Sequence, residues 1–153
     1  MSLREQIDAK YKSSVKSKNT NEINTLRLIK SAIQNQEIEN RSVNNPIEIN
    51  DQQILGLMQN LIKQRRDSIE SFKSANRTDL IEIENKEIEI INQFLPKQLN
   101  EEETKKIIVN FLKDNNLSSL KDMGKVMNYL KSNYTGSVEM GLAGKLAKEL
   151  LNI

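Results

Sequence analysis

The sequence predicts an all-α protein in which four longer helices are followed by a C-terminal bundle of three shorter helices. Three observations predict this fold class. Apolar residues recur with the helical period along most of the 153-residue chain. Glycine is scarce, and the two prolines, Pro46 and Pro96, fall at breaks in that periodicity. Residues that cap helices stand just before several of the periodic segments.

The first two expected helices are separated by a short polar break. The first opens with a capping box, in which the side chains of Ser2 and Glu5 satisfy each other's free backbone N–H groups. The stretch Asn19-Thr20-Asn21 ends it, and the second helix is expected over residues 21–40. A loop is expected over residues 42–49. The residues expected to face the core are Leu3, Ile7, Tyr11, Leu26, Ile29 and Ile33.

The third expected helix carries the clearest apolar stripe in the chain. Asn50 is positioned to cap it, with Gln53 three residues later. Its stripe consists of Ile54, Leu57, Met58, Leu61, Ile62, Ile69 and Phe72, with a gap at Arg65. A fourth helix is expected to be capped by Asn76 and to end before Pro96, because the residue before a proline avoids the helical region. Apolar residues on two of its faces predict contacts with two neighbouring elements.

The segment 96–99 is expected to be a hinge. A chain of this length suits one domain or two small ones, and the parts before and after the hinge each have their own apolar stripes. We therefore expect an N-terminal helical domain over residues 1–96 and a C-terminal three-helix domain over residues 97–153.

The C-terminal domain is expected to contain three short helices. Asn100 opens the first of them, and three glutamates in its first turn suit the positive end of the helix dipole. Ser119 is expected to cap the second, with Asp122 three residues later. The third is expected to bury the stripe formed by Leu142, Leu146 and Leu150.

The composition excludes several classes of enzyme. The chain contains no Cys, His or Trp. Without Cys there is no disulfide, thiol nucleophile or thiolate metal site. Without His there is no imidazole base, no Ser-His-Asp triad and no ordinary zinc site. Carboxylates, lysines and backbone groups remain for chemistry, and we expect no catalytic residue, no metal and no cofactor.

Two clusters invite a ligand-binding interpretation, but neither has the required pattern. The glycines around Gly144 do not form a phosphate loop, because Glu139 stands where that motif needs glycine and Leu146 follows Lys145. They are expected instead to permit close helix packing or, at Gly141, to mark an irregular helix start. The acidic residues of the fourth helix lack the histidine partners of carboxylate metal sites, so a solvated face is expected. These residues are Asp79, Glu82, Glu84, Glu87 and Glu89.

Arg65 interrupts the stripe of the third helix and has two interpretations. The charges of the segment 63–67 are spaced to form i,i+4 pairs on a solvated face. Alternatively, an acid of the fourth helix, Glu84 or Glu87, holds Arg65 in an ion pair that fixes the register of the two helices. The net stabilisation from such a pair would be small, because desolvation opposes the Coulomb attraction.

The last third of the chain is basic. The net charge of the whole chain is only +2, but residues 104–153 contain eight lysines and four acids. The candidate phosphate contacts are Lys121, Lys125, Lys131, Lys145 and Lys148, because point charges on a rigid bundle can follow phosphates without reading bases. A plain solvated surface explains the same lysines. We expect no aromatic residues positioned among them for base stacking, and therefore no readout of single strands.

Five segments of the sequence resemble the YqeY family of small proteins, in order and at family spacing. These segments are Thr25–Ala32, Lys63–Glu70, Asn76–Leu80, Leu95–Leu99 and Asp122–Met127. The resemblance covers essentially the whole chain, which is also similar to the C-terminal tail region of the GatB subunit of a tRNA-dependent amidotransferase. One departure lies at residues 137–141, where many members have an Arg-Ala-Asp-Gly type of stretch. Here Glu139 keeps the acid, and the basic residue is lost.

The resemblance implies an all-α fold and a link to tRNA, with four of the candidate lysines, Lys121, Lys125, Lys145 and Lys148, as phosphate contacts. The family is often labelled a glutamine-dependent amidotransferase, a carbon–nitrogen ligase. That reaction needs a glutaminase nucleophile, an ATP site and usually Mg²⁺, and this chain alone shows no motif for them. We therefore expect a non-catalytic module that binds tRNA or other structured RNA, or an accessory to amidotransferase or synthetase subunits. The alternative is a protein–protein adaptor that uses the apolar surface of the fourth helix.

The sequence predicts no association with a membrane. No apolar run approaches the ~20 residues of a membrane span, and the mean hydropathy is −0.62. The first five residues lead into no apolar stretch, which argues against a secretory signal. The expected location is therefore the cytosol.

Overall fold

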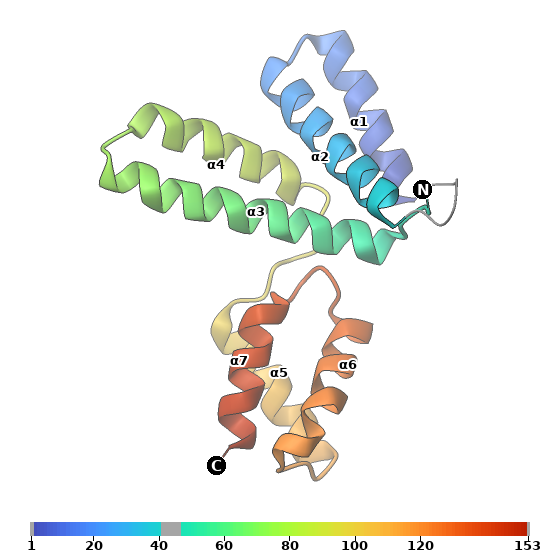
Figure 1. Cartoon of the computed structure of the whole chain (residues 1–153), viewed down its shortest axis with the longest axis vertical. Coiled ribbons are helices and arrows are strands. Elements are labelled where there is room, and N and C mark those ends of the chain that lie inside the picture. Colours follow the sequence, from blue (N-terminus) through green and yellow to red (C-terminus); the bar gives the residue numbers. More distant parts are fainter. Residues whose placement is uncertain (1, 41–46, 153) are drawn as a thin grey trace. The chain divides into compact units, whose positions relative to one another are not determined.

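A computed structural model describes residues 2–40 and 47–152, and these residues form helices and no strand. This confirms the predicted all-α class. The α-helices in chain order are α1 (Leu3–Ser17), α2 (Thr20–Glu39), α3 (Asp51–Ser74), α4 (Thr78–Asn92), α5 (Glu101–Asp114), α6 (Met123–Asn133) and α7 (Met140–Leu151), with a short 3₁₀ helix η1 (Leu120–Asp122) before α6 (Figure 1). Most of the expected loop at 42–49 lies outside the described residues.

The chain divides into two compact units, Met1–Leu95 and Pro96–Ile153. The first contains α1 to α4, and the second contains α5, η1, α6 and α7. Each unit has a separate hydrophobic core. The buried core residues of the first unit are Leu3, Ile7, Leu26, Ile29, Ile33, Ile49, Ile54, Met58, Ile62 and Ile91. Those of the second are Ile108, Leu112, Val126, Leu130, Val138, Ala143, Leu146, Ala147 and Leu151.

The expected caps at the start of α1 and α3 are confirmed. The Ser2 hydroxyl accepts from the backbone N–H of Glu5 at 3.2 Å, and the Glu5 carboxylate accepts from the N–H of Ser2. Asn50 and Gln53 form the same reciprocal pair, with both distances at 2.9 Å. Because each box satisfies two N–H groups that lack helical partners, the chain enters both helices at a defined residue.

The expected cap of α4 at Asn76 is wrong. Arg77 precedes the first turn of α4 without a side-chain cap, and Asn76 lies in the left-handed region with φ of 56°. The N–H of Arg77 donates to the carbonyl of Phe72 at 2.9 Å, and the N–H of Asn76 donates to that of Lys73 at 3.2 Å. This pair of bonds is a Schellman motif, so Asn76 ends α3 rather than beginning α4.

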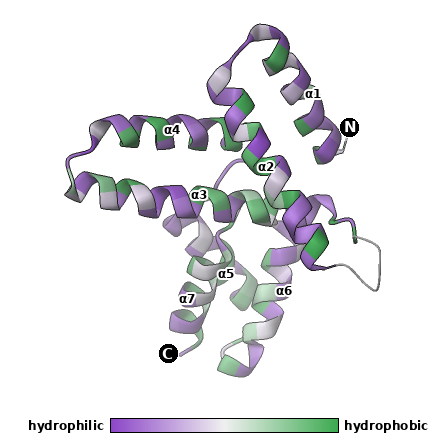
Figure 2. Cartoon of the chain, turned by 45° about the horizontal axis from the view of Figure 1, so that its top comes forward, coloured by the Kyte–Doolittle hydropathy of each residue, from purple (hydrophilic) through white to green (hydrophobic). Residues whose placement is uncertain are grey.

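The helix α4 contacts both α3 and α2, as its two apolar faces predict. Figure 1 shows α3 and α4 side by side as an antiparallel hairpin. In Figure 2 the hydrophilic and hydrophobic colours alternate along α4. Its fully or nearly buried residues are Ile90 and Ile91, in its last turns, whereas Ile83 is 49% exposed. The burial of α4 is therefore concentrated near its C-terminal end.

Two details of the second unit differ from expectation. Ser119 caps η1, by accepting from the N–H of Lys121 at 3.3 Å, whereas α6 begins at Met123 after Asp122. In α7 the buried residues are Ala143, Leu146, Ala147 and Leu151, while Leu142 and Leu150 are only partly buried. The buried stripe of α7 thus includes two alanines, and α7 contacts both α5 and α6. The cap of α5 at Asn100 is as expected.

Candidate functional site

The candidate phosphate-binding lysines are all exposed and lie on three helices of the second unit. Lys121 is on η1, Lys125 and Lys131 are on α6, and Lys145 and Lys148 are on α7. Nζ of Lys125 lies 3.6 Å from Oδ1 of Asp122 in an i,i+3 ion pair, in which the lysine side chain is 68% exposed and the aspartate side chain 20%. A large ligand in solution can therefore reach these side chains.

The structure divides these lysines between different faces. A Cβ placed on Gly144 of α7 would lie 3.8 and 3.9 Å from the Cε atoms of Met127 and Met123, so these methionines mark the side of α6 that faces α7. Lys125 is two residues from each methionine, which places it roughly half a turn away. Lys125 therefore points away from α7 and does not share a face with Lys145.

An aromatic cluster lies between α5 and α6. The rings of Phe111 and Tyr129 are stacked, with centroids 4.2 Å apart and planes within 13°. Tyr134, just beyond α6, meets Tyr129 edge-on with centroids 6.0 Å apart. A hydrogen bond with Tyr134, together with burial and the nearby charge of Asp114, raises the pKa of the Tyr129 hydroxyl. All the aromatic residues of the second unit are thus in one place.

These rings line a hollow of about 430 Å³ in the surface of the second unit. Its other lining residues are Ile107, Asn110, Asp114 and Asn115. The amide nitrogen of Asn115 donates to the carbonyl of Phe111 at 2.9 Å and fixes the end of α5. The hollow thus has an aromatic wall and a rim of amide and carboxylate groups.

Sequence reasoning did not identify this hollow. The expectation that no aromatic residue is positioned among the candidate lysines is wrong, because Tyr129 lies between Lys125 and Lys131 on α6. Phe111 is separated from Tyr129 by a helix end, a loop and the start of another helix, so no local motif joins them. The available signal was helical register: Phe111 lies on the flank of the stripe of α5, and Tyr129 lies next to Leu130 of α6. Only the packing of the two helices shows that the flanks face each other.

In the first unit, Arg65 pairs with an acid of α4. Its Nε lies 2.7 Å from Oε2 of Glu87, and its Nη1 donates to the carbonyl of Leu61 at 3.0 Å. The side chains of Arg65 and Glu87 are only 11% and 21% exposed. Burial, and then the charge of Glu87, raise the pKa of Glu84, whereas Arg65 opposes this shift. The three groups form a partly buried charge cluster between α3 and α4.

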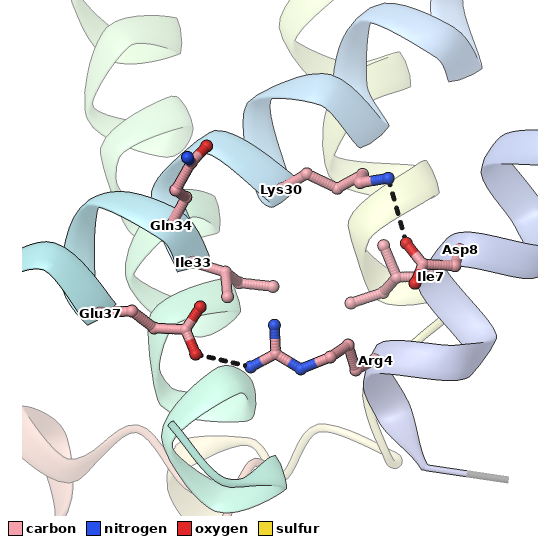
Figure 3. A pocket seen from close by; sticks show the side chains of 7 residues that line it. All are labelled: Arg4, Ile7, Asp8, Lys30, Ile33, Gln34 and Glu37. Atoms are coloured by element: carbon pink, nitrogen blue, oxygen red, sulfur yellow. Dashed lines mark hydrogen bonds and ion pairs between the residues drawn. The ribbon is translucent and has the colours of Figure 1, made fainter. Parts of the chain in front are cut away.

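A second hollow, of about 360 Å³, lies between α1 and α2. Figure 3 shows two ion pairs beside an apolar floor formed by Ile7 and Ile33. The ion pairs join Arg4 to Glu37 at 2.9 Å and Lys30 to Asp8 at 3.0 Å. Glu37 also accepts from the backbone N–H of Ile49 at 3.1 Å. Because its cations and anions are paired with each other, we interpret these side chains as contacts that hold α1 against α2 rather than as a ligand site.

The remaining candidate groups show no ligand site. Among residues 2–40 and 47–152, no group of three His, Cys, Asp or Glu side chains is placed to hold a metal ion. Asp79, one of the acids of α4, is instead within 3.2 Å of Arg77. Within the same described ranges, no helix is both long enough and apolar enough to cross a membrane.

The sequence of this chain matches a known protein family. Residues 4–151 match the model of the family described as Yqey-like protein. This match covers nearly the whole chain, and the chain therefore belongs to the YqeY-like family.

Three fungal proteins are similar to this chain. A protein of Clavispora lusitaniae named "Altered inheritance of mitochondria protein 41, mitochondrial" is 37% identical over 99 residues, which are 63% of this chain and 55% of the relative. A protein of the same name from Lachancea thermotolerans is 41% identical over 71 residues, 46% of this chain and 36% of the relative. An uncharacterized protein of Schizosaccharomyces pombe is 35% identical over 91 residues, 60% of this chain and 70% of the relative. The matches thus span about half and about a third of the two relatives named first.

Proposed function

We propose that the second unit binds structured RNA, with tRNA as the expected class, and that the protein acts as a non-catalytic accessory module. The observation that carries this proposal is the exposed pair Lys121 on η1 and Lys125 on α6, of which Lys125 points away from α7. A folded three-helix unit holds both charges at fixed positions. Fixed positive charges bind phosphates without reading sequence, and structured RNA is recognised largely through shape and backbone.

The resemblance to the C-terminal tail region of the GatB subunit supports the same proposal. The family resemblance suggests amidotransferase or synthetase subunits as partners, in which other chains would supply any carbon–nitrogen ligase chemistry. In this arrangement the present chain holds RNA and supplies no reacting group. A cytosolic location remains our expectation from the sequence, although the names of two fungal relatives include the word mitochondrial.

The adaptor alternative has weaker support. On α4 the large apolar side chain that stands exposed is Ile83, and the other exposed apolar side chains of the described residues are distributed over several helices and segments. Single exposed apolar residues are ordinary on protein surfaces and do not indicate a docking site.

The test compares the wild-type chain with Lys121→Glu/Lys125→Glu by fluorescence anisotropy of labelled total tRNA, with duplex DNA of similar length as competitor. The double variant is expected to abolish tRNA binding while the helical circular-dichroism signal stays unchanged. Wild-type affinity is expected to fall steeply with salt, because each neutralised phosphate releases counterions. Unaltered tRNA binding by the double variant would remove the proposal.

A matched control carries the same change of charge on another face. Lys145→Glu/Lys148→Glu alters two exposed lysines of α7, one turn apart. Because Lys145 does not share a face with Lys125, the control is expected to weaken tRNA binding less than the first double variant does. Equal losses from both variants would indicate attraction by net charge alone and would contradict the specific role of Lys121 and Lys125.

A further inference from the structure

The aromatic hollow of the second unit has features of a base-binding site. In the stacked pair Phe111 and Tyr129 each ring covers one face of the other, so a base would extend the stack on an outer ring face, and Tyr134 stands at an angle of 67° to Tyr129 as a side wall. All three residues are only partly buried. Stacking on such rings is the usual way that proteins hold an unpaired base, since every base has an aromatic face.

Polar groups stand at the rim of this hollow. Asn110 and Asp114 lie one turn apart on α5, and both are exposed. The carboxylate of Asp114 accepts hydrogen bonds, and the amide of Asn110 both donates and accepts them. These are the complements of the amino and ring groups on the edge of a base. The negative charge of Asp114 disfavours a phosphate inside the hollow.

Positive charges flank the hollow on both helices. On α6, Lys125 is one turn before Tyr129 and lies on the same side of the helix, with Lys121 beyond it on η1. On α5, Lys106 and Lys113 are each about one turn from Asn110, and both are exposed. A strand that enters the hollow with a base can therefore keep its phosphates outside, beside lysines.

From this arrangement we propose that the hollow lined by Phe111, Tyr129 and Tyr134 binds one unpaired nucleobase of an RNA strand whose phosphates lie along Lys125 and Lys121. This inference rests on the proposed function and makes it more specific: the unit grips RNA at a single-stranded end or loop next to its structured part. It also gives the aromatic residues a role that the lysines alone do not supply.

The test uses two RNA hairpins with the same stem, one blunt and one with a four-nucleotide 3′ overhang, and the full-length chain. The variant Tyr129→Leu removes the ring and keeps an apolar side chain against the core. It is expected to weaken binding of the overhang hairpin about tenfold, since stacking on one base contributes at that scale. Binding of the blunt hairpin is expected to be unchanged. The matched control Tyr129→Phe keeps the ring and is expected to keep the wild-type affinity for both hairpins.

A second measurement reads the hollow directly. The chain has no Trp and three Tyr, so in a Tyr11→Phe background all tyrosine fluorescence comes from Tyr129 and Tyr134. A base stacked in the hollow should quench this fluorescence. The expected result is quenching by the overhang hairpin that saturates with binding, and little quenching by the blunt hairpin.

The outcomes separate this inference from the proposed function. If the wild-type chain binds both hairpins equally, or if Tyr129→Leu weakens both equally or neither, the base-binding hollow is overturned while RNA binding stands. Absence of quenching by a bound overhang hairpin has the same meaning. If the wild-type chain binds neither hairpin and no tRNA, the proposed function fails, and the inference fails with it.

Discussion

Nε of Arg65 donates to Oε2 of Glu87 at 2.7 Å and joins α3 to α4 at the position where a charged residue interrupts the apolar stripe of α3. Leu61, one turn earlier, supplies a carbonyl that accepts a second hydrogen bond from the same guanidinium. Glu84 is close enough for its pKa to respond to both charged partners. Arg65 thus binds Glu87 directly and opposes the rise in the pKa of Glu84, and its removal would leave the charges of both acids without a nearby cation.

Replacement of Arg65 by methionine is expected to lower the free energy of unfolding by about 1–3 kcal/mol, because Glu87 loses its charged donor without regaining full contact with water. The measurement is urea unfolding followed by circular dichroism. The control is a double-mutant cycle with Glu87→Gln. If Arg65→Met costs as much in the Glu87→Gln background as in the wild type, the two side chains do not interact energetically.

Glu84 gives a prediction about pH. Burial and the charge of Glu87 hold its pKa above the ordinary value of 4.5 in the folded protein. The folded state therefore binds the Glu84 proton more tightly than the unfolded state does. The resulting stabilisation is present below the ordinary pKa and is lost as the pH rises through the raised pKa. At neutral pH the ionised group opposes folding.

We expect Glu84→Gln to be more stable than the wild type at neutral pH, and the difference to shrink as the pH falls to about 4. Urea unfolding of both proteins across this pH range measures the difference between their free energies of unfolding. The contributions of the other carboxylates are common to both proteins and cancel in this difference. A difference that is constant with pH, or that grows on acidification, would show that the pKa of Glu84 is not raised in the folded state.

Local sequence patterns predicted most of the helical elements, but the long-range clusters could not be read from them. The capping boxes at Ser2 and Asn50 follow from side chains three residues apart, so the sequence alone contains the whole interaction. The pair of Arg65 with Glu87 was one of two interpretations, because a sequence does not say which face of α4 meets α3. For the stack of Phe111 on Tyr129, helical register placed each ring beside a buried stripe but did not show that the two rings meet.

The error at Asn76 has a specific physical cause. Asparagine is favoured both as the N-cap residue of a helix and in the left-handed turn that ends a helix. Asn76 lies between two helices, so the sequence permits both roles. Its φ of 56° assigns the second role. Asn116, at the end of α5, has φ of 53° and the same pattern of hydrogen bonds, in which the N–H of Leu117 donates to the carbonyl of Leu112. In a chain with five glycines, asparagine takes the place that glycine usually fills.

The glycines of the helices give a further prediction. Gly144 was expected to permit close packing, but a Cβ there would meet Met123 and Met127 only at ordinary contact distances. Gly144→Ala is therefore expected to stabilise the second unit by about 0.5–1 kcal/mol, since alanine loses less backbone entropy in a helix. Thermal unfolding measures the effect. The control is Gly136→Ala, where φ of 82° makes alanine strained and a loss of about 1–2 kcal/mol is expected. Destabilisation by Gly144→Ala would show that α6 and α7 need the missing side chain.

The left-handed residues at the ends of helices provide the last prediction. Lys18 ends α1 with φ of 59° and the same Schellman bonds, in which the N–H of Asn19 donates to the carbonyl of Ser14 at 3.1 Å. A lysine in this conformation is strained by its Cβ, so Lys18→Gly is expected to raise the free energy of unfolding by about 1 kcal/mol.

Asn76→Gly is expected to be neutral or slightly stabilising, because asparagine tolerates the conformation better. The variant Asn76→Ser distinguishes the two roles of Asn76. Serine is as good as asparagine at an N-cap but is poor in the left-handed region, so the free energy of unfolding is expected to fall by about 1 kcal/mol. Urea unfolding that shows Asn76→Ser to be neutral and Asn76→Gly to be destabilising would return Asn76 to the role of cap for α4.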